Sequence, residues 1–429
     1  GSGWAGFNLL RHLKAESYDV TLISPRNYFV FTPLLAGTAS GTLEFRAATE
    51  PVRAFAKGKN YLEAKCTSID PRNGVVECQS VFSDTKDIRN FRIPYDRLVI
   101  AVGSHTNTFG IEGVKEHAHF LKDVTDSRRI RKRIMDCFEM AAQPGLSSEE
   151  RSRLLHFAVV GGGPTGVELS AELADLIHDD MSRFYPELMP HTSVTVYDVA
   201  PRILGSFDAK LSEYASKRFK REGIRIRTKG KGRLKSIYRL FIDNHYSSLF
   251  YPSLWIVVPY GLLVWATGIA ANPLLSSLKD QVSLDKVGRL EVDSNLRVLN
   301  AQGQPMDGVY AIGDCSSLKG SPLPATAQVA NQQASYLGKV FKQITQQSGV
   351  EANIPPFRYR YAGAMAYVGG WRAVAEIGES PKKVRGSGVG AWIFWRSAYL
   401  NMSVSWKNKV LIPSYWLYSW IFGRDISRF

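Results

Sequence analysis

The pattern of hydrophobic and polar residues at the start of the chain predicts part of a strand, helix and strand unit. Residues 1–6 read GSGWAG, and the segment from Phe7 to Lys14 has helix character. The β-branched run from Asp19 to Ile23 predicts the strand that follows. Such a glycine loop works only where a strand leads into a helix, so we expect the natural chain to carry further residues at its start, including any targeting segment.

The same unit returns about 160 residues later. An apolar strand from Leu155 to Val160 leads into the second glycine loop, Gly161 to Gly166 (GGGPTG), and then into a helix that extends through Leu176. Another strand is predicted from Ser193 to Tyr197 and is followed by Asp198. We therefore expect an α/β fold class with two tandem Rossmann-like dinucleotide-binding domains.

A long uncharged segment raises the alternative of a transmembrane helix. The 33 residues from Tyr246 to Leu278 contain no charged side chain. Pro252 and Pro259 interrupt this segment, and the runs Leu254 to Val258 and Leu262 to Trp265 predict two strands around a turn. We therefore reject a membrane-spanning helix at this place.

The excess positive charge is concentrated in two regions. The chain has 54 Lys and Arg against 39 Asp and Glu, which gives a formal net charge of +15 and favours an anionic partner. The window from Lys217 to Lys235 holds ten basic residues and one acid, and the segment from Trp371 to Phe429 holds nine basic and three acidic residues. The first window has one aromatic residue, so we interpret it as a solvated edge, with lipid contact as the alternative, and expect no nucleic-acid partner.

The four cysteines are far apart in the sequence and form no CxxC motif. This spacing argues against a zinc cluster and a redox-active dithiol, so we expect no metal site and a reducing compartment.

Glycine loops at strand-to-helix turns bring backbone N–H groups close to a pyrophosphate at the positive end of a helix. Asp198 stands where an acid accepts a hydrogen bond from the adenosine ribose and repels a 2′-phosphate, which favours NADH over NADPH, although Arg202 lies nearby. The first unit has Ser24 and Arg26 at that place, which suits a phosphate. Two dinucleotides in one chain imply a tightly held flavin and a nicotinamide that supplies hydride to it.

Several motifs occur in the order of one known family. They are GSGWAG, SPRNYFVFTPLL, GGGPTGVE, ATG at 266–268, YAIGDC at 310–315, AQVANQQ at 327–333 and WRSAYL at 395–400. With these motifs the chain resembles the type II (alternative) NADH:quinone oxidoreductases, in particular the mitochondrial ones, within the two-dinucleotide-binding-domain flavoproteins of the glutathione-reductase fold. Residues 236–253 match nothing in that pattern. The resemblance implies non-covalent FAD, NADH as donor and ubiquinone or a related membrane quinone as acceptor.

The resemblance also implies which residues contact each ligand. For FAD they are Gly1, Gly3, Trp4, Ala5, Gly6, Ser24, Pro25, Arg26, Thr32, Pro33, Leu34, Ala101, Gly103, Gly313, Asp314, Ala327 and Gln328. For NADH they are Gly161, Gly163, Pro164, Thr165, Gly166, Glu168, Asp198, Arg202, Ala266, Thr267 and Gly268.

Four residues are expected to take part in the chemistry or to hold the quinone. Glu168 would face the nicotinamide, orient NADH or assist proton transfer, with a helix-capping carboxylate as the alternative. Gln328 and Gln332, one helical turn apart, would line the quinone end of the flavin ring, with helix-surface glutamines as the alternative. Tyr399 is a second candidate for the quinone slot.

The end of the chain is rich in tryptophan and predicts a membrane-association segment. The residues Trp392, Trp395, Tyr399, Met402 and Trp406 fall on one face of a helix, and Lys407 and Lys409 follow. A second aromatic segment after Pro413 contains Trp416 and Trp420. We expect these five tryptophans to contact an anionic phospholipid surface, and the first helix to take part in a homodimer.

The resulting hypothesis is a peripheral, non-proton-pumping NADH:quinone oxidoreductase of the mitochondrial inner membrane, with the membrane side left open. We expect residues 1–150 and 275–360 to form a discontinuous FAD-binding domain, residues 151–274 the NADH-binding domain, and residues 361–429 the membrane-anchoring and dimerisation segment. One alternative is a soluble NADH-dependent reductase of a ferredoxin-like protein. Another is a basic membrane- or nucleic-acid-binding protein with a vestigial dinucleotide fold.

Overall fold

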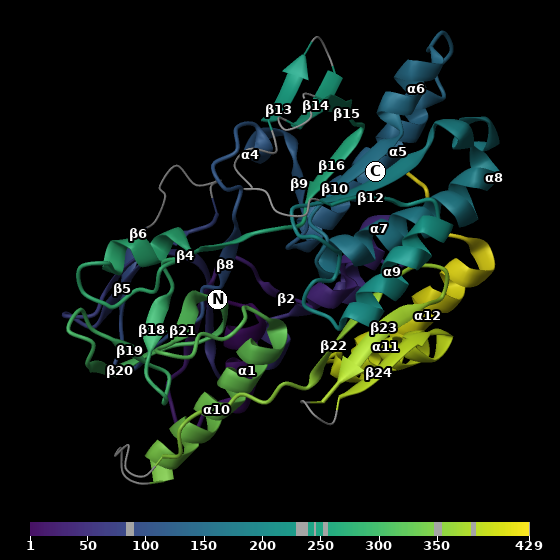
Figure 1. The fold of residues 1–429 in the computed structure, drawn as a ribbon. Helices are drawn as coiled ribbons and strands as arrows, with labels where there is room; N and C mark the ends of the chain where they lie inside the picture. Colours follow the sequence, from purple (N-terminus) through teal and green to yellow (C-terminus); the bar gives the residue numbers. More distant parts are fainter. Residues whose placement is uncertain are drawn as a thin grey trace. The chain divides into compact units, whose positions relative to one another are not determined.

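The computed structural model describes residues 1–82, 90–228, 239–243, 246–251, 256–346, 354–378 and 383–428 (Figure 1). The chain forms two compact units, each built from three separate stretches. Unit 1 contains residues 1–30, 50–105 and 269–360. Unit 2 contains residues 31–49, 106–268 and 361–429.

The two larger sheets among the described residues of unit 1 have four and five strands. The first has the strand order β1-β4-β5-β6, with β1 parallel to β4 and the other pairs antiparallel. The second has the order β21-β18-β19-β20-β7 and includes the parallel pair β20 and β7. The bounds are β1 Thr21–Ser24, β4 Asn60–Asp70, β5 Val75–Ser80, β6 Asn90–Pro94, β7 Leu98–Ile100, β18 Leu290–Val292, β19 Arg297–Leu299, β20 Pro305–Ala311 and β21 Ser316–Leu318.

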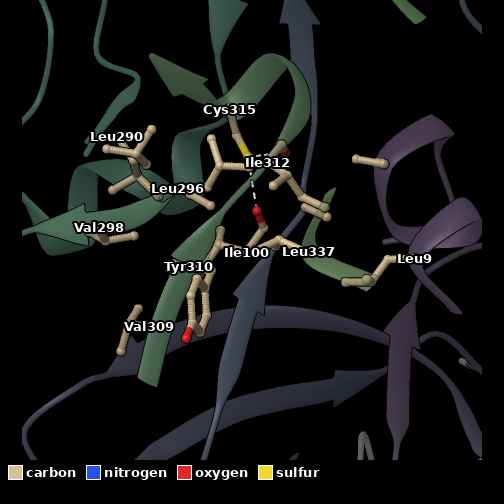
Figure 2. Packing of buried hydrophobic residues seen from close by; sticks show 14 of the residues in the cluster. Leu9, Ile100, Leu290, Leu296, Val298, Val309, Tyr310, Ile312, Cys315 and Leu337 are labelled. Atoms are coloured by element: carbon tan, nitrogen blue, oxygen red, sulfur yellow. Dashed lines mark hydrogen bonds between the residues drawn. The ribbon is translucent and has the colours of Figure 1, made fainter. Parts of the chain in front are cut away.

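Two helices pack against each other beside these sheets, α1 (Trp4–His12) and α10 (Ala327–Gln346). Between them and the second sheet lies an apolar core that includes Leu9, Tyr310 and Leu337, and Figure 2 shows its packing. The buried Cys315 thiol donates to the carbonyl oxygens of Ile100 and Ile312, each at 3.3 Å. This cysteine is therefore part of the packed core. The short helix α3 spans Arg53–Ala56, and the short strands β2, β3, β8 and β17 span Tyr28–Val30, Thr49–Pro51, Ser104–Thr106 and Ile269–Ala271.

Unit 2 is built on a sheet of five parallel strands in the order β12-β11-β10-β16-β9. All five residues of β10 are buried because helices cover the sheet, as is usual for parallel sheets. The strand bounds are β9 His119–Phe120, β10 His156–Val160, β11 Ser193–Asp198, β12 Arg225–Thr228 and β16 Leu262–Trp265. The helices are α2 Leu35–Ser40, α4 Val114–His117, α5 Val124–Ala141, α6 Ser148–Leu154, α7 Pro164–Leu176, α8 Ser182–Phe184 and α9 Ala209–Arg221, with a π-helix, η3, at Ile177–Met181.

The C-terminal part of unit 2 is an antiparallel sheet followed by two helices. The sheet contains β22 (Gly363–Tyr367), β23 (Ala373–Ile377) and β24 (Val384–Gly388), and the helices are α11 (Val389–Met402) and α12 (Trp406–Phe422). The single helix face predicted from Trp392 through Trp406 is wrong, because α11 ends at Met402 and the Ser405 side chain caps a new helix through the Asn408 N–H. Pro413 does not separate two segments but lies inside α12.

The predicted glycine-loop units are confirmed as local structure. The helix expected from Phe7 is α1, and the strands expected around Leu155, Ser193 and Leu262 are β10, β11 and β16. The uncharged segment from Tyr246 forms β14 (Tyr246–Tyr251), β15 (Ile256–Pro259) and β16, and β13 (Arg239–Asp243) pairs with β14. Among the residues that the structure describes, no helix is both long and apolar enough to cross a membrane.

Two sequence expectations extend beyond the described residues. The basic window from Lys217 continues into residues 229–235, which lie outside the described residues. In the unmatched stretch at 236–253, residues 236–238, 244–245 and 252–253 also lie outside them. In the described part of the window, Arg225 and Arg227 are exposed on β12, and Lys217 forms an exposed ion pair with Glu213. This part has the character of the solvated edge that we expected.

The boundaries of the two units differ from the predicted domain ranges. Residues 31–49 and 106–150, which the sequence placed with the first domain, belong to unit 2 together with residues 361–429. Two of the cysteines that are far apart in the sequence are neighbours in the fold. Cys66 and Cys78 stand opposite each other on β4 and β5, as free thiols. Burial raises the pKa of the Cys66 thiol to about 12, which leaves it protonated and unreactive at neutral pH.

Candidate functional site: two glycine loops and a buried glutamic acid

In the first glycine loop, two of the glycines leave no room for a side chain, and one has free space beside it. A Cβ atom on Gly6 would lie 1.9 Å from the Gly1 carbonyl oxygen, and one on Gly1 would lie 2.5 Å from the Ala101 carbonyl oxygen, so both positions require glycine. By contrast, a Cβ on Gly3 would meet no described atom within 4 Å. The backbone of Gly3, at the N-terminus of α1, is therefore accessible to a phosphate group.

The residues expected to accompany this loop hold it in place. The buried Ser24 hydroxyl donates to Ser2 Oγ at 2.9 Å and accepts from the Ser2 N–H at 3.2 Å. Ser24 therefore braces the loop from the end of β1, a role beyond the FAD contact that the resemblance implies. The Arg26 guanidinium lies 5.9 Å from the Tyr28 ring, and Pro25 is exposed.

The late Gly-Asp motif is fixed by a residue that the sequence analysis did not single out. The Gln333 side chain is 2 % exposed, and its Oε1 accepts from the Gly313 N–H at 2.7 Å. Gly313 has a φ of +78°, which favours glycine, and Asp314 accepts from the Ser104 hydroxyl at 2.8 Å. The signal for Gln333 was its place at the end of AQVANQQ, beside the two glutamines that drew attention.

The second glycine loop repeats the arrangement of the first. A Cβ on Gly166 would lie 1.9 Å from the Gly161 carbonyl oxygen, and one on Gly161 would lie 2.8 Å from the Ala266 carbonyl oxygen. No described atom lies within 4 Å of the corresponding place on Gly163, the N-cap of α7. Pro164 and Thr165 begin the helix, and the Pro164 ring fits its first turn.

Asp198 closes this loop from the end of β11. Its carboxylate accepts from the backbone N–H of Gly162 and, at 2.7 Å, from that of Ala200. Arg202 is exposed in the segment that follows, and Gly268, after Ala266 and Thr267, has a φ of +78°. Asp198 therefore shapes the loop, a role beyond the ribose contact predicted from the sequence.

Glu168, on the first turns of α7, has its carboxyl group buried in unit 2. Its Oε1 accepts from the Tyr367 N–H at 3.2 Å and from Trp395 Nε1 at 3.1 Å. Burial raises the pKa of Glu168 to about 8, against these two hydrogen bonds, which lower it. The side chain does not cap the helix; it is a carboxylic acid that carries its proton at neutral pH.

A small pocket opens on this carboxyl group. Apolar and aromatic side chains form most of its wall, and the polar ones come from α7 and the segment after α2. The lining residues are Pro33, Leu34, Ala36, Gly37, Thr42, Leu43, Glu168, Glu172, Tyr367, Trp395 and Trp416. The pocket thus combines an apolar lining with a few polar groups, as binding sites for small aromatic molecules do.

Two more acids follow Glu168 on the same face of α7. Glu172 Oε2 accepts from the hydroxyls of Ser40 at 2.8 Å and Thr42 at 2.6 Å. Asp175 accepts from the Tyr367 hydroxyl at 2.5 Å, and burial raises the pKa of Asp175 to about 7, with the neighbouring Glu172 adding to the shift. Their spacing of four and seven residues from Glu168 on a buried helix was the available sequence signal.

A cation from the end of the chain completes the cluster. Arg424 donates to Asp180 Oδ2 at 2.7 Å and to Thr42 Oγ1 at 3.0 Å. Burial by itself would lower the pKa of Arg424, but Glu172, Asp175 and Asp180 together raise it above its ordinary value. The residues after α12 are thereby tied to η3 and to the segment after α2.

The predicted quinone residues are engaged in other contacts. Gln332 forms a paired interaction with the Arg360 backbone: its Nε2 donates to the Arg360 oxygen at 2.7 Å, and its Oε1 accepts from the Arg360 N–H at 3.0 Å. Gln328, at the start of α10 after Ala327, accepts from the Tyr359 hydroxyl. Gln332 thus fixes the backbone of Arg360 to α10 within unit 1. Gln328 is instead hydrogen-bonded to Tyr359, a residue that the sequence did not suggest.

Comparison with known proteins agrees with these features. A family model described as pyridine nucleotide-disulphide oxidoreductase matches residues 1–334, and one described as NDH2 C-terminal domain matches residues 361–425. The chain is 40 % identical over 451 residues to the internal alternative NAD(P)H-ubiquinone oxidoreductase A1, mitochondrial, of Solanum tuberosum, covering 100 % of this chain and 87 % of the relative. The chain belongs to the alternative NAD(P)H-ubiquinone oxidoreductase family.

Two further matches support this membership. A probable NADH dehydrogenase of Dictyostelium discoideum is 40 % identical over 435 residues, covering 100 % of this chain and 90 % of that protein. The structure of NDH2 from Plasmodium falciparum in complex with NADH has a TM-score of 0.88 and 30 % identity, and covers 100 % of this chain and 98 % of that one. The resemblance and the α/β dinucleotide-binding fold inferred from the sequence are confirmed.

Within this alternative oxidoreductase, three residues expected at FAD lie in unit 2. Thr32, Pro33 and Leu34 form a short 3-10 helix, η1, and Pro33 and Leu34 line the pocket of Glu168. Tyr399 packs against Trp395 at 4.8 Å and Phe31 at 6.1 Å between ring centroids, and it is not among the lining residues that the structure describes. Tyr399 therefore supports Trp395 rather than contacting the pocket directly.

The five tryptophans expected at the membrane differ in exposure. Trp395 and Trp416 are buried in unit 2, so their indoles are not exposed for the direct membrane contact expected from the sequence. Trp406 and Trp420 are 82 % and 65 % exposed, and Trp392 is partly buried. The large apolar side chains that are exposed on α11 and α12 are instead Val389, Ile393, Phe394, Met402, Trp406, Val410, Leu417, Tyr418, Trp420, Ile421 and Phe422, which we call the exposed apolar face of these helices.

Proposed function

We propose that this alternative oxidoreductase oxidises NADH and reduces ubiquinone or a related quinone, without pumping protons, as a peripheral protein of the mitochondrial inner membrane. Its relatives are named as mitochondrial NAD(P)H-ubiquinone oxidoreductases. The observation that carries the proposal is the repeated glycine loop, with its open central glycine at Gly3 in one unit and at Gly163 in the other. Two such loops hold two dinucleotides in one chain.

The residues of unit 1 fit the adenosine and ribityl parts of FAD. Gly3 offers its backbone to the pyrophosphate at the N-terminus of α1, and Asp314, held by Ser104, offers a carboxylate to ribityl hydroxyls. A flavin bound there supplies the two-electron chemistry that joins NADH to a quinone. Unit 2 provides the NADH site, where Gly163 meets the pyrophosphate and Asp198 the ribose.

Glu168 can supply one of the two protons that quinone reduction requires. Reduction of a quinone to a quinol takes up two electrons and two protons, and hydride from NADH brings both electrons with one proton. A carboxylic acid with a pKa of about 8 holds the further proton at neutral pH and can release it to an oxygen that gains electrons. Leu34, Trp395 and Trp416 line the pocket beside that acid, which is 7 % exposed.

Membrane association rests on the exposed apolar face of α11 and α12. Large apolar side chains such as Trp406, Trp420 and Phe422 are exposed there at 65–82 %, beside Lys407 and Lys409. An apolar face flanked by cations suits the interface of an anionic phospholipid membrane. The homodimer expected through α11 would use part of the same face.

One cuvette experiment tests the function. The purified protein should show flavin absorbance that NADH bleaches under nitrogen, and a short-chain ubiquinone should restore it with formation of one quinol per NADH. Replacing the quinone by an oxidised ferredoxin is the matched arm. Restoration by the ferredoxin alone would overturn the proposal in favour of a soluble reductase.

A further inference from the structure

The guanidinium of Arg396, on α11, lies in a cage of three tryptophans. Its central carbon is 4.2 Å from the Trp392 ring, 4.4 Å from the Trp416 ring and 5.8 Å from the Trp371 ring. The three indoles come from α11, α12 and the turn between β22 and β23. Such stacking fixes the plane of the guanidinium and leaves its N–H edge as the hydrogen-bonding surface.

That edge lacks an acceptor from the protein. Within the described residues, no hydrogen bond or ion pair joins the Arg396 side chain to another group. Its Nε is buried without a partner, whereas its two terminal nitrogens are not among the buried unpaired atoms and so remain accessible. Glu172 is the nearby carboxylate that acts on its charge, but Glu172 accepts from Ser40 and Thr42 instead. A charged group with a buried, unpaired donor is costly, and the accessible terminal N–H groups can pair with an anion from outside.

The cage is built at some cost in backbone geometry. Trp371 has a φ of +63°, in the left-handed region that large side chains rarely adopt, and it follows two glycines with φ of +85° and +56°. The Tyr367 hydroxyl accepts from the Trp371 N–H at 3.3 Å and supports this turn. Trp371 is 45 % exposed, so the cage opens to the surface at this side.

The surroundings indicate the kind of anion. Ile393 and Phe394 precede Arg396 on α11, Leu417 follows Trp416 on α12, and these three side chains are 43–56 % exposed. A guanidinium held by tryptophans beside exposed apolar groups matches the boundary between lipid phosphates and acyl chains. Burial lowers the pKa of Arg396 to about 10, so the guanidinium keeps its charge at neutral pH.

We propose that Arg396 and its tryptophan cage form a specific site for the phosphate of an anionic phospholipid. The site rests on the proposed membrane association and adds a defined headgroup contact to it. The fork of N–H groups pairs with two phosphate oxygens, and the neighbouring apolar side chains lie along the acyl chains. This contact also locks α11 to α12 when the protein is on the membrane.

The test is flotation of the FAD-loaded protein with vesicles of phosphatidylcholine alone or with one quarter phosphatidylglycerol. Arg396→Gln should lose at least tenfold in affinity for the anionic vesicles and keep its affinity for the neutral ones. Lys407→Gln, a matched loss of one exposed cation on α12, should lose about fivefold, the usual effect of one charge near such a surface. Arg396→Lys, which keeps the charge but not the planar fork of N–H groups, should fall between the two.

Each other outcome is decisive. Equal losses for Arg396→Gln and Lys407→Gln would reduce Arg396 to one surface charge and overturn the site. Failure of the wild type to bind any vesicle would overturn the proposed membrane association itself. Soluble dihexanoyl phosphatidylglycerol should change the tryptophan fluorescence of the wild type and not of Arg396→Gln, and an equal change with inorganic phosphate would overturn the assignment to a lipid.

Discussion

The substitution Glu168→Gln tests the protonation state of the pocket. Glutamine keeps an oxygen that can accept from the Tyr367 N–H and Trp395 Nε1, as Glu168 does at 3.2 and 3.1 Å. It removes the ionisable proton and little else. The side chain is 7 % exposed, so its environment changes little between the two proteins.

The expected effect follows from the raised pKa. The Glu168 pKa rises from 4.5 to about 8 on folding, so between these values the folded protein binds a proton that the unfolded chain has released. The free energy of unfolding of the wild type therefore falls as the pH rises through this window, by up to ~1.4 kcal/mol per pH unit. Glutamine does not titrate, so its variant does not lose stability in this way. The free energy of unfolding of the variant, relative to that of the wild type, should therefore increase by roughly 3 kcal/mol between pH 5 and pH 8.

The assay is urea unfolding of both FAD-loaded proteins at pH 5, 6, 7 and 8, followed by tryptophan fluorescence. Other titrating groups are common to both proteins and cancel in the difference. Glu213→Gln is the control, because Glu213 is an exposed partner of Lys217, and its stability difference from the wild type should not grow with pH. A constant difference between Glu168→Gln and the wild type would show that Glu168 is ionised at neutral pH and would refute its role as a proton carrier.

Three other substitutions have defined outcomes. Asp198→Ala should raise the KM for NADH and narrow the preference over NADPH about tenfold, the value of one charge-assisted hydrogen bond, and an unchanged ratio of the two kcat/KM values would contradict the ribose contact. Gln333→Ala should release the Gly313 turn and lower the FAD content per protein measured by absorbance, whereas Gln343→Ala, exposed on the same helix, should not. Arg424→Gln should lower the free energy of unfolding by roughly 3–5 kcal/mol in urea, because it leaves Asp180 buried without its cation, and an effect no larger than that of the exposed Arg428→Gln would argue against the buried cluster.

Local patterns identified the elements that build the two nucleotide loops. At Gly6 and Gly166 a side chain would collide with the carbonyl oxygen of a glycine five residues earlier. Because both partners are close in the sequence, the spacing of glycines after a strand predicts this arrangement. Glu168 was singled out as a candidate because it stands two residues past the last glycine of the second loop. The protonated state of Glu168 could not be predicted in this way, because the residues that bury its carboxyl group, Tyr367 and Trp395, come about 200 residues later in the chain.

Periodicity alone was insufficient in the C-terminal segment. Aromatic residues at helical spacing continue past Met402, but the Ser405 cap starts a second helix with a different buried face. Trp395 and Trp416 are thereby placed inside unit 2, and Arg396 is placed among the tryptophans. The choice between Gln332 and Gln333 likewise depends on the backbone groups of Arg360 and Gly313, which no pattern within the motif reveals.

The measurement that tests the central claim most directly is anaerobic titration of the purified protein's flavin absorbance. The account predicts one bound FAD per chain, complete bleaching by one equivalent of NADH, and full recovery with one equivalent of a short-chain ubiquinone. A protein without flavin, or a flavin that NADH reduces but ubiquinone does not reoxidise, would contradict it.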